Sequence, residues 1–415
     1  MDARFGFVFI VGTLAAQTPT FTKDVAPILN KNCVVCHRAG DIAPMSLLSY
    51  EEARPWAKSI KAQIAAGNMP PWHATEPRGT FSNDRRLTAQ EKQTLVAWVD
   101  GGAPKGDPKD LPAAPTFAEG WEMGKPDIVL SMAKPYPVPA SGTIRYQYVQ
   151  IPTGFTEDKW VQALEVRPGV RRVVHHILVF AKEPAGAQAR PPFTQVVPKI
   201  PAFGTEEGGR GPGVLIATTA PGTNSMTFPE GTALRIKAGS VLTFQIHYTA
   251  SGKAAEDTSS VGFIFAKQAP EQEMRTSAFM NPMFTLPAGD PNKEVDCVVE
   301  FTQDTRLYAI FPHTHVRGKD WSYQVVYPDG RKQQVLSVPH YDFNWQTYYT
   351  FTTPLALPKG ARLEAVAHYD NSENNPSNPD PKANVHWGEQ TWQEMQYTGI
   401  TFTVDEKAVA SAARQ

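Results

Sequence analysis

The chain reads VLTFQIHY over residues 241–248. From Leu242 onward, apolar and polar side chains alternate, and successive side chains of a strand point to opposite faces. This period of two predicts a half-buried strand. Its apolar face belongs in a core, whereas the other face places His247 beside polar groups. The stretch therefore indicates a fold rich in β-strands and also a candidate functional residue.

Seven further stretches are strand-like, because they are rich in β-branched and aromatic residues and are bounded by turns. They are residues 144–151, 160–166, 173–180, 295–301, 307–311, 322–327 and 362–369. The 37 prolines also suit strands joined by turns better than long helices. Short strands at this density predict two all-β, jelly-roll-like sandwich domains. Their junction is expected at residues 268–283, where the alternation lapses.

The composition excludes several classes of protein. With 415 residues, the chain is long enough for about three domains, each with its own core. It carries 40 basic against 41 acidic residues, and 41% of its residues are hydrophobic. This balance differs from that of a disordered chain or of a protein with several membrane spans, and it does not favour nucleic acid as a partner.

An apolar run at residues 5–16 follows Arg4 and precedes Gln17. About 12 residues are too few to span a bilayer, and small residues at the end of such a run are typical of a signal cleavage site. We therefore expect a signal peptide at residues 1–16, a periplasmic or secreted protein, and no membrane span after cleavage. A buried N-terminal helix is the alternative. Three cysteines make no disulfide framework, so Cys297 is expected to be a small buried residue.

Residues 17–102 have helical periodicity. Helices are predicted over 21–30, 50–66 and 88–100, the last with the capping box Thr88 and Glu91 at its start and Gly101 at its end. Residues 103–126 contain several prolines and no apolar period, which predicts a semi-rigid linker. The expected fold is therefore a small all-α domain at 17–102, sandwiches at 127–268 and 269–407, and a tail at 408–415.

The pentad CVVCH at residues 33–37 is the most specific motif of the helical region. Cys33 and Cys36 offer thiols that can form thioethers with the vinyl groups of haem, and His37 can ligate the iron from one side. A thioredoxin-like redox pair would need a βαβ setting, and a zinc site would need a second pair of ligands. Neither is found in the surrounding sequence.

With this pentad, residues 17–102 resemble small c-type cytochromes. The resemblance implies one covalently bound haem c with a second axial ligand. Met69, in the stretch GNMPPW at residues 67–72, looks like the family's Met-Pro ligand loop. Met45 and His73 remain alternatives for the second ligand, and core packing is the ordinary role of any one methionine.

Five histidines outside the pentad fall into three compact sets, which are His175 with His176, His247, and His313 with His315. Residues i and i+2 of a strand share a face, so His313 and His315 can hold one metal ion without distortion. Adjacent His175 and His176 point to opposite faces of a regular strand, so they can bind one ion only where the backbone bulges or turns. A hydrogen-bonded packing role is the alternative for each histidine.

These sets resemble the motifs of the copper type II, ascorbate-dependent monooxygenases, the family of peptidylglycine hydroxylase and dopamine β-hydroxylase. The matching stretches occur in the family's order and read VHHIL at 174–178, FQIHY at 244–248, PHTHVRGK at 312–319 and EM at 394–395. The resemblance implies one copper ion in the first sandwich, held by His175, His176 and His247. It implies a second, catalytic copper ion in the second sandwich, held by His313, His315 and Met395.

The ligand types agree with this resemblance. Three imidazoles suit a copper ion that cycles between oxidation states, whereas a thioether in place of the third imidazole favours Cu(I), the form that binds dioxygen. The resemblance therefore implies hydroxylation of a C–H bond in a small organic substrate with O2. A methionine that packs in a strand core is the alternative for Met395.

The chain also departs from the family. Phe311 stands where the peptide-hydroxylating branch has an arginine for a substrate carboxylate, so a peptidylglycine substrate is not expected. The haem suggests electrons from a periplasmic donor or an ascorbate-like reductant. His340, His368 and His386 are expected to be structural. The alternative function is a periplasmic haem and copper electron-transfer protein, which would have no need of a thioether beside an open copper position.

Overall fold

The structure is a computed structural model that describes residues 18–39, 43–116, 120–184, 192–199, 213–220 and 225–405. The expected signal peptide at 1–16 and the expected tail at 408–415 lie outside these ranges. The chain forms two units. Unit 1 comprises Met1–Pro70 and Arg85–Thr116, and unit 2 comprises Pro71–Asp84 and Phe117–Gln415.

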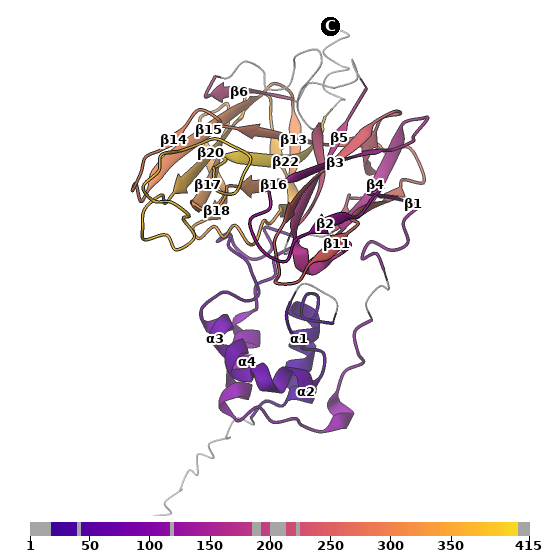
Figure 1. The fold of residues 1–415 in the computed structure, drawn as a ribbon, viewed down its shortest axis with the longest axis vertical. Helices are drawn as coiled ribbons and strands as arrows, with labels where there is room; N and C mark the ends of the chain where they lie inside the picture. The colour runs from indigo at the N-terminus through magenta and orange to yellow at the C-terminus, as the bar shows by residue number, and fades with distance from the viewer. Residues whose placement is uncertain are drawn as a thin grey trace, which may run out of the picture. The chain divides into compact units, whose positions relative to one another are not determined.

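Unit 1 contains the α-helices of the described chain (Figure 1). They are α1 (Ala26–Asn32), α2 (Tyr50–Ala53), α3 (Ala57–Ala65) and α4 (Ala89–Asp100), with the π-helical turn η1 (Phe21–Val25) and the 3-10 turns η2 (Arg54–Trp56) and η3 (Pro108–Asp110). The three predicted helical stretches are confirmed, although the first two are divided. α4 begins with the predicted capping box, in which Thr88 and Glu91 each accept a hydrogen bond from the other's backbone N–H.

The core of unit 1 forms around Trp98, which is fully buried. Its ring centroid lies 6.1 Å from that of Phe21, and its indole N–H donates to the carbonyl of Pro104 at 3.0 Å. The backbone N–H of Phe21 donates to the same carbonyl, also at 3.0 Å. The first residues of the predicted linker are therefore packed against the helices of unit 1.

Unit 2 is built from strands. In its first half they are β1 (Ile128–Ser131), β2 (Tyr136–Val138), β3 (Gln147–Pro152), β4 (Lys159–Arg167), β5 (Val174–Lys182), β6 (Phe193–Val197), β7 (Val214–Thr219), β8 (Ser225–Thr227), β9 (Thr232–Ile236), β10 (Val241–Tyr248), β11 (Ala255–Asp257) and β12 (Ser260–Phe265). In its second half they are β13 (Gln272–Met280), β14 (Thr285–Leu286), β15 (Lys293–Phe301), β16 (Thr305–His313), β17 (Gly318–Val326), β18 (Lys332–Val338), β19 (Tyr349–Leu357), β20 (Arg362–Tyr369), β21 (Val385–His386) and β22 (Tyr397–Val404). Each of the eight predicted strand stretches overlaps one of these strands.

The first half of unit 2 buries its core between two sheets. One is the β1-β12-β4-β9 end of a nine-stranded sheet, and the other is the four-stranded sheet β3-β10-β5-β7. Phe263 of the first sheet and Phe244 of the second are fully buried in this core. The apolar face of β10 lies there as the alternation predicted, with Leu242, Phe244, Ile246 and Tyr248.

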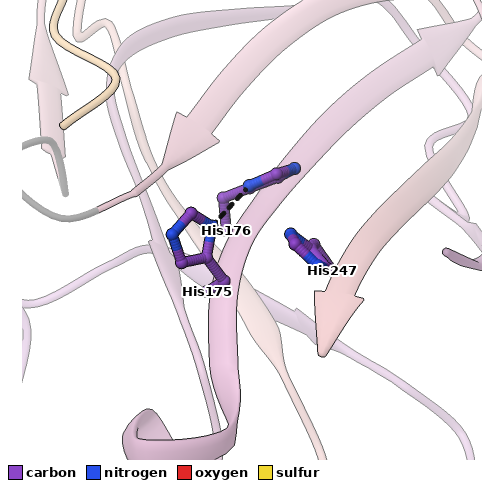
Figure 2. Close-up of side chains that lie close together, drawn as sticks. All are labelled: His175, His176 and His247. Atoms are coloured by element: carbon purple, nitrogen blue, oxygen red, sulfur yellow. Dashed lines mark hydrogen bonds between the residues drawn. The ribbon is translucent and has the colours of Figure 1, made fainter. Parts of the chain in front are cut away.

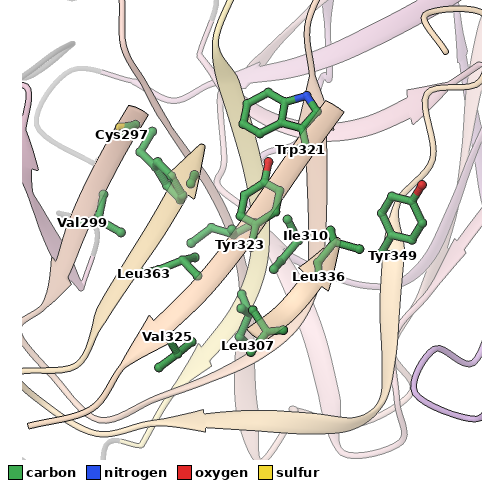
Figure 3. Close-up of a cluster of buried hydrophobic side chains, with 14 of the residues drawn as sticks. Cys297, Val299, Leu307, Ile310, Trp321, Tyr323, Val325, Leu336, Tyr349 and Leu363 are labelled. Carbon is green, nitrogen blue, oxygen red and sulfur yellow. The ribbon is translucent and has the colours of Figure 1, made fainter. Parts of the chain in front are cut away.

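The second half buries its core between the β13-β22-β16-β19 end of the same nine-stranded sheet and the five-stranded sheet β18-β17-β20-β15-β6. Figure 3 shows Ile310 of β16 facing Tyr323 and Leu336 of the five-stranded sheet, all three fully buried. Cys297 of β15 is fully buried in the same core, which is the packing role expected of it.

β13 joins the two halves. It pairs in parallel with β9 of the first half and antiparallel with β22 of the second. β6 lies between β5 and β7 in the sequence, yet it pairs with β15 of the five-stranded sheet. The expectation of two separate sandwich domains is therefore corrected, because residues 272–280 are a strand inside one continuous sheet.

The expectation of a separate, small all-α cytochrome c domain at residues 17–102 is wrong. The α-helices of the described chain have 7, 4, 9 and 12 residues, and Pro71–Asp84 belongs to unit 2. Trp72 and Phe81 lie in the core of the second half, and Phe81 forms a β-bridge with Phe351. The strands of unit 2 bury these apolar side chains. Residues 17–102 therefore do not form a separate helical domain. No helix in the described ranges is long and apolar enough to cross a membrane.

Candidate metal centre

β5 and β10 bring three histidines to one site. His176 is paired with His247, and the next residue of β10, Tyr248, is paired with Val174. His175 is therefore the extra residue of a β-bulge. The bulge turns two adjacent histidines toward the same site, which a regular strand would prevent.

The three imidazoles converge (Figure 2). One ring nitrogen from each of His175, His176 and His247 lies within 4.8 Å of the other two. The Nδ1 atoms of His175 and His176 are 3.1 Å apart. Two nitrogens bound at about 2.0 Å to one tetrahedral ion would lie roughly 3.3 Å apart. The observed spacing therefore fits shared coordination of one ion.

Burial keeps this first histidine set neutral. It lowers the pKa of His247 to about 3, with a smaller contribution from His175, and it also lowers the pKa of His175 and of His176. Within the described part of the chain, Nδ1 of His247 and Nε2 of His176 are buried without a hydrogen-bond partner. Buried polar atoms normally have a partner, so the orphaned Nδ1 of His247 indicates a ligand site. A neutral imidazole is the form that binds a metal.

The second histidine set lies at the end of β16. His313 is the last residue of that strand, His315 follows in the turn before β17, and both are buried. Nδ1 of His313 lies 3.1 Å from Oε1 of Gln346, and Nδ1 of His315 lies 3.1 Å from the carbonyl oxygen of Gln393. These oxygens can only accept, so each Nδ1 carries the proton and each Nε2 has a free lone pair. Among the described residues, Nε2 of His315 has no partner, and burial lowers the pKa of His313 to about 4.

The segment that carries Met395 is held against the His315 turn by Glu394, whose side chain is fully buried. Burial raises the pKa of Glu394 to about 8, and the backbone hydrogen bonds that it accepts oppose this effect. Glu394 accepts hydrogen bonds from the backbone N–H groups of His315 at 2.8 Å, Arg317 at 2.7 Å and Met395 at 3.3 Å. The carbonyl of Met395 accepts from the hydroxyl of Tyr369 at 2.7 Å. The backbone of Met395 is thus fixed beside the second histidine set.

The two histidine sets meet in one cluster. The ring centroid of Phe343 lies between 5.2 and 6.5 Å from those of all five histidines. Gln346, which is fully buried, bridges the sets, because its Oε1 faces His313 and its Nε2 lies 3.2 Å from Nδ1 of His176. The resemblance implied different sandwiches for the two sets, whereas Phe343 and Gln346 contact both of them.

Sequence reasoning missed the residues between the sets. Phe343 and Gln346 lie in the irregular stretch before β19, where no periodicity or motif distinguishes them. Tyr146 was also missed, although its ring centroid lies 4.8 Å from that of His247 and 5.6 Å from that of His176. Glu394 was noticed only as the neighbour of Met395. Its position in the sequence did not reveal that its side chain accepts hydrogen bonds from the backbone of His315 and Arg317.

The CVVCH pentad forms a turn at the end of α1 in unit 1. The backbone N–H groups of Cys36 and His37 donate to the carbonyl of Cys33 at 3.1 and 2.9 Å, and neither cysteine is in a disulfide. Burial, with smaller contributions from Cys36 and Glu91, raises the pKa of Cys33 to about 12. A thiol that ionises so reluctantly is poorly suited to disulfide exchange or to zinc binding as a thiolate.

The three candidates for a second haem ligand lie in different places. Met45 and Met69 belong to unit 1 with the pentad, whereas His73 belongs to unit 2. Burial lowers the pKa of His37, and a hydrogen bond with the backbone of Met45 opposes this effect. Burial also lowers the pKa of His73, where Asp342 opposes the effect and His340 adds to it.

Two of the remaining histidines have polar side-chain partners. His368 bonds through Nδ1 to Asp320 at 2.7 Å, and its Nε2 lies 3.3 Å from Glu294. His386 pairs through Nδ1 with the hydroxyl of Thr285 at 3.1 Å. His340 is exposed.

The chain matches no protein-family model and no curated protein sequence. Among solved structures it is similar to the major capsid protein of bacteriophage PM2, with a TM-score of 0.31 and 11% identity over 67% of this chain and 97% of that one. It is also similar to allantoicase from Saccharomyces cerevisiae, with a TM-score of 0.19 and 5% identity over 65% of this chain and 80% of that one. TM-scores this low support no inference about fold or function.

Proposed function

We propose that this protein is a copper-dependent monooxygenase that hydroxylates a C–H bond of a small organic substrate with O2. The observation that carries the proposal is the cluster of five neutral imidazoles around Phe343, three of them buried, with ring nitrogens that have no partner among the described residues. Three imidazoles alone would also suit zinc. The His-x-His pair beside a methionine segment adds a soft ligand, which favours copper.

His175, His176 and His247 would hold one copper ion, and His313, His315 and Met395 would hold the other. Bound copper supplies one-electron redox chemistry and the activation of O2. The protein keeps the imidazoles neutral and oriented for this task. Gln346 and the carbonyl of Gln393 orient His313 and His315, and Glu394 holds the backbone around them.

The surroundings of the second set exclude water and support an apolar or aromatic substrate. His313 is 5% exposed and His315 is fully buried. The ring of Phe311 is stacked on Tyr348, with centroids 4.5 Å apart, and its centroid lies 6.1 Å from that of His313. The ring of Phe311 carries no charge, so it cannot form an ion pair with an anionic group of a substrate.

We further propose that one covalent haem c, attached through Cys33 and Cys36 with His37 as an axial ligand, supplies electrons. Each hydroxylation reduces O2 with two electrons beyond those taken from the substrate, and it yields one water besides the hydroxylated product. A periplasmic donor or an ascorbate-like reductant would provide these electrons. The expected signal peptide supports a periplasmic or secreted location.

The test uses the full-length protein loaded with copper and reduced with ascorbate. It is mixed with 18O-labelled dioxygen and a panel of small aromatic and aliphatic compounds, and both oxygen uptake and product mass are measured. We expect oxygen uptake and a product that carries one 18O atom. A double variant His313→Ala, His315→Ala should lose both signals, because it lacks the second set.

His368→Ala is the matched control, since this histidine is bonded to Asp320 and Glu294. It should keep oxygen uptake and product. A reduced, copper-loaded protein that passes electrons to an added acceptor but consumes no oxygen would overturn the proposal in favour of an electron-transfer protein.

A further inference from the structure

Gln346 touches both histidine sets with the two ends of one amide. Its Oε1 lies 3.1 Å from Nδ1 of His313, and its Nε2 lies 3.2 Å from Nδ1 of His176. The side chain is fully buried, so water does not compete for these bonds. The carbonyl of Phe343 is a second acceptor for Nε2, at 3.4 Å.

The two ends of an amide are not equivalent, because the oxygen only accepts and the nitrogen only donates. His313 must therefore carry its proton on Nδ1, which leaves the lone pair of Nε2 free. His176 must accept at Nδ1, which places its proton on Nε2. The same amide thus selects opposite tautomers on the two histidines.

We propose that Gln346 is a positioning residue for both metal sites. It prepares His313 to bind through Nε2 and His176 to bind through Nδ1. The inference rests on the proposed copper sites and names the residue that couples them. An ion that binds Nδ1 of His176 would replace the hydrogen bond from Nε2 of Gln346. That nitrogen would still donate to the carbonyl of Phe343, and Oε1 of Gln346 would still accept from His313.

The geometry of the first set agrees with binding through Nδ1. Nδ1 of His176 faces Nδ1 of His175 at 3.1 Å. Nδ1 of His247 is the ring nitrogen of that residue that is buried without a partner among the described residues. The tautomer selected by Gln346 therefore leaves the lone pair of His176 facing Nδ1 of His175. It also leaves the N–H at Nε2 of His176 buried without an acceptor among the described residues.

The first test measures tautomers in the metal-free, full-length protein labelled with 15N in histidine. Signals are assigned by their loss in His176→Ala and His313→Ala. At pH 7.5, wild type should show a protonated Nδ1 in His313 and a protonated Nε2 in His176. Gln346→Glu should move the proton of His176 to Nδ1 and leave His313 unchanged, because a carboxylate accepts at both ends. A proton on Nε2 of His313 in wild type, or an unchanged His176 in Gln346→Glu, would overturn the inference.

The second test measures Cu(I) affinity by anaerobic titration against a competing chelator. Each set is measured alone, in a background where the other set is removed by His175→Ala with His247→Ala or by His313→Ala with His315→Ala. Gln346→Met should weaken the second set by roughly 10–100-fold, the usual effect of losing the acceptor that holds the other ring nitrogen of a metal-binding histidine. It should not weaken the first set in this way, because Nε2 of Gln346 occupies the lone pair that the ion would take from His176. Unchanged affinity at the second set would identify Gln346 as a packing residue.

Gln195→Met is the matched control, because Gln195 bonds only to backbone atoms in the contacts seen here, with Nε2 donating to the carbonyl of Met280 at 2.8 Å. It should change neither the tautomers nor the affinities. The two tests also separate this inference from the proposed function. Failure of wild type to bind copper would count against the function, whereas wrong tautomers in a protein that binds two copper ions would count against Gln346 alone.

Discussion

His176 and His247 are direct partners across β5 and β10, and the register between the two strands shifts immediately beyond them. The ring centroid of His247 consequently lies 5.0 Å from that of His176 and 5.1 Å from that of the bulged His175. A bulge interrupts the hydrogen-bond ladder of a sheet, and here it makes room for a third imidazole. The irregularity of the strand is what turns a pair of histidines into a set of three.

Two copper ions are expected per chain, and His247→Ala should remove one of them. The variant deletes the imidazole that β10 contributes to the first set, while His313 and His315 keep their bonds to Gln346 and Gln393. Elemental analysis of the purified protein should fall from two copper ions to one. Loss of both ions would mean that the five histidines act as a single cluster.

Met395→Leu should weaken Cu(I) binding at the second set alone. The fold should survive, because this volume-conserving swap usually costs less than about 1.5 kcal/mol. Met395→His should keep copper bound but abolish hydroxylation, since a third imidazole suits Cu(I) and O2 less well than a thioether. Titration with Cu(I) measures the first effect, and turnover under O2 measures the second.

Met283→Leu is the control for these variants, because the side chain of Met283 is 68% exposed. It should behave as wild type in both measurements. Unchanged Cu(I) affinity together with full turnover in Met395→Leu would identify Met395 as a packing residue.

Cys36→Ser should abolish the haem that survives extraction with acidic acetone, because the serine hydroxyl forms no thioether. Cys297→Ala should keep that haem, since Cys297 lies in the core of unit 2. Both proteins should be produced with a c-type maturation system and compared by absorption. If the wild-type protein shows no haem absorption under these conditions, the proposal that it carries haem c is wrong.

Met69→Ala should lower the reduction potential of the haem more than Met45→Ala or His73→Ala does. A thioether axial ligand raises the potential, so its loss lowers it. Redox titration followed by absorption measures the three variants. The largest fall in any variant other than Met69→Ala would assign the second axial ligand to that other residue.

The metal-free protein should lose stability as the pH falls below about 6.5, the ordinary pKa of histidine in an unfolded chain. Burial lowers the pKa of His247 to about 3 and that of His313 to about 4 in the folded protein. Between these values the unfolded chain binds more protons, so acid favours unfolding. Each of the two histidines should cost about 2 kcal/mol at pH 5. Urea denaturation at pH 7.5 and 5.0 measures the loss, which His247→Ala should reduce, whereas equal losses in the variant and in wild type would contradict this origin.

Local pattern was enough to predict several features. The alternation around Phe244 predicted β10 and its buried face, and the capping box at Thr88 predicted the start of α4. The need for a bulge at His175 also followed from the sequence, because adjacent residues of a regular strand face opposite ways. These predictions succeeded because each depends on residues close together in the chain.

The sequence by itself determined eight of the strands, the helices of unit 1 and the histidine sets, since backbone geometry makes period and spacing local properties. Only the tertiary structure decided that β13 would join the halves in one sheet, that Trp72 and Phe81 would be buried by strands, and that Gln346 would lie between His176 and His313. These outcomes depend on strand pairing and apolar burial between segments far apart in the chain. No local period encodes which distant surface a side chain will meet.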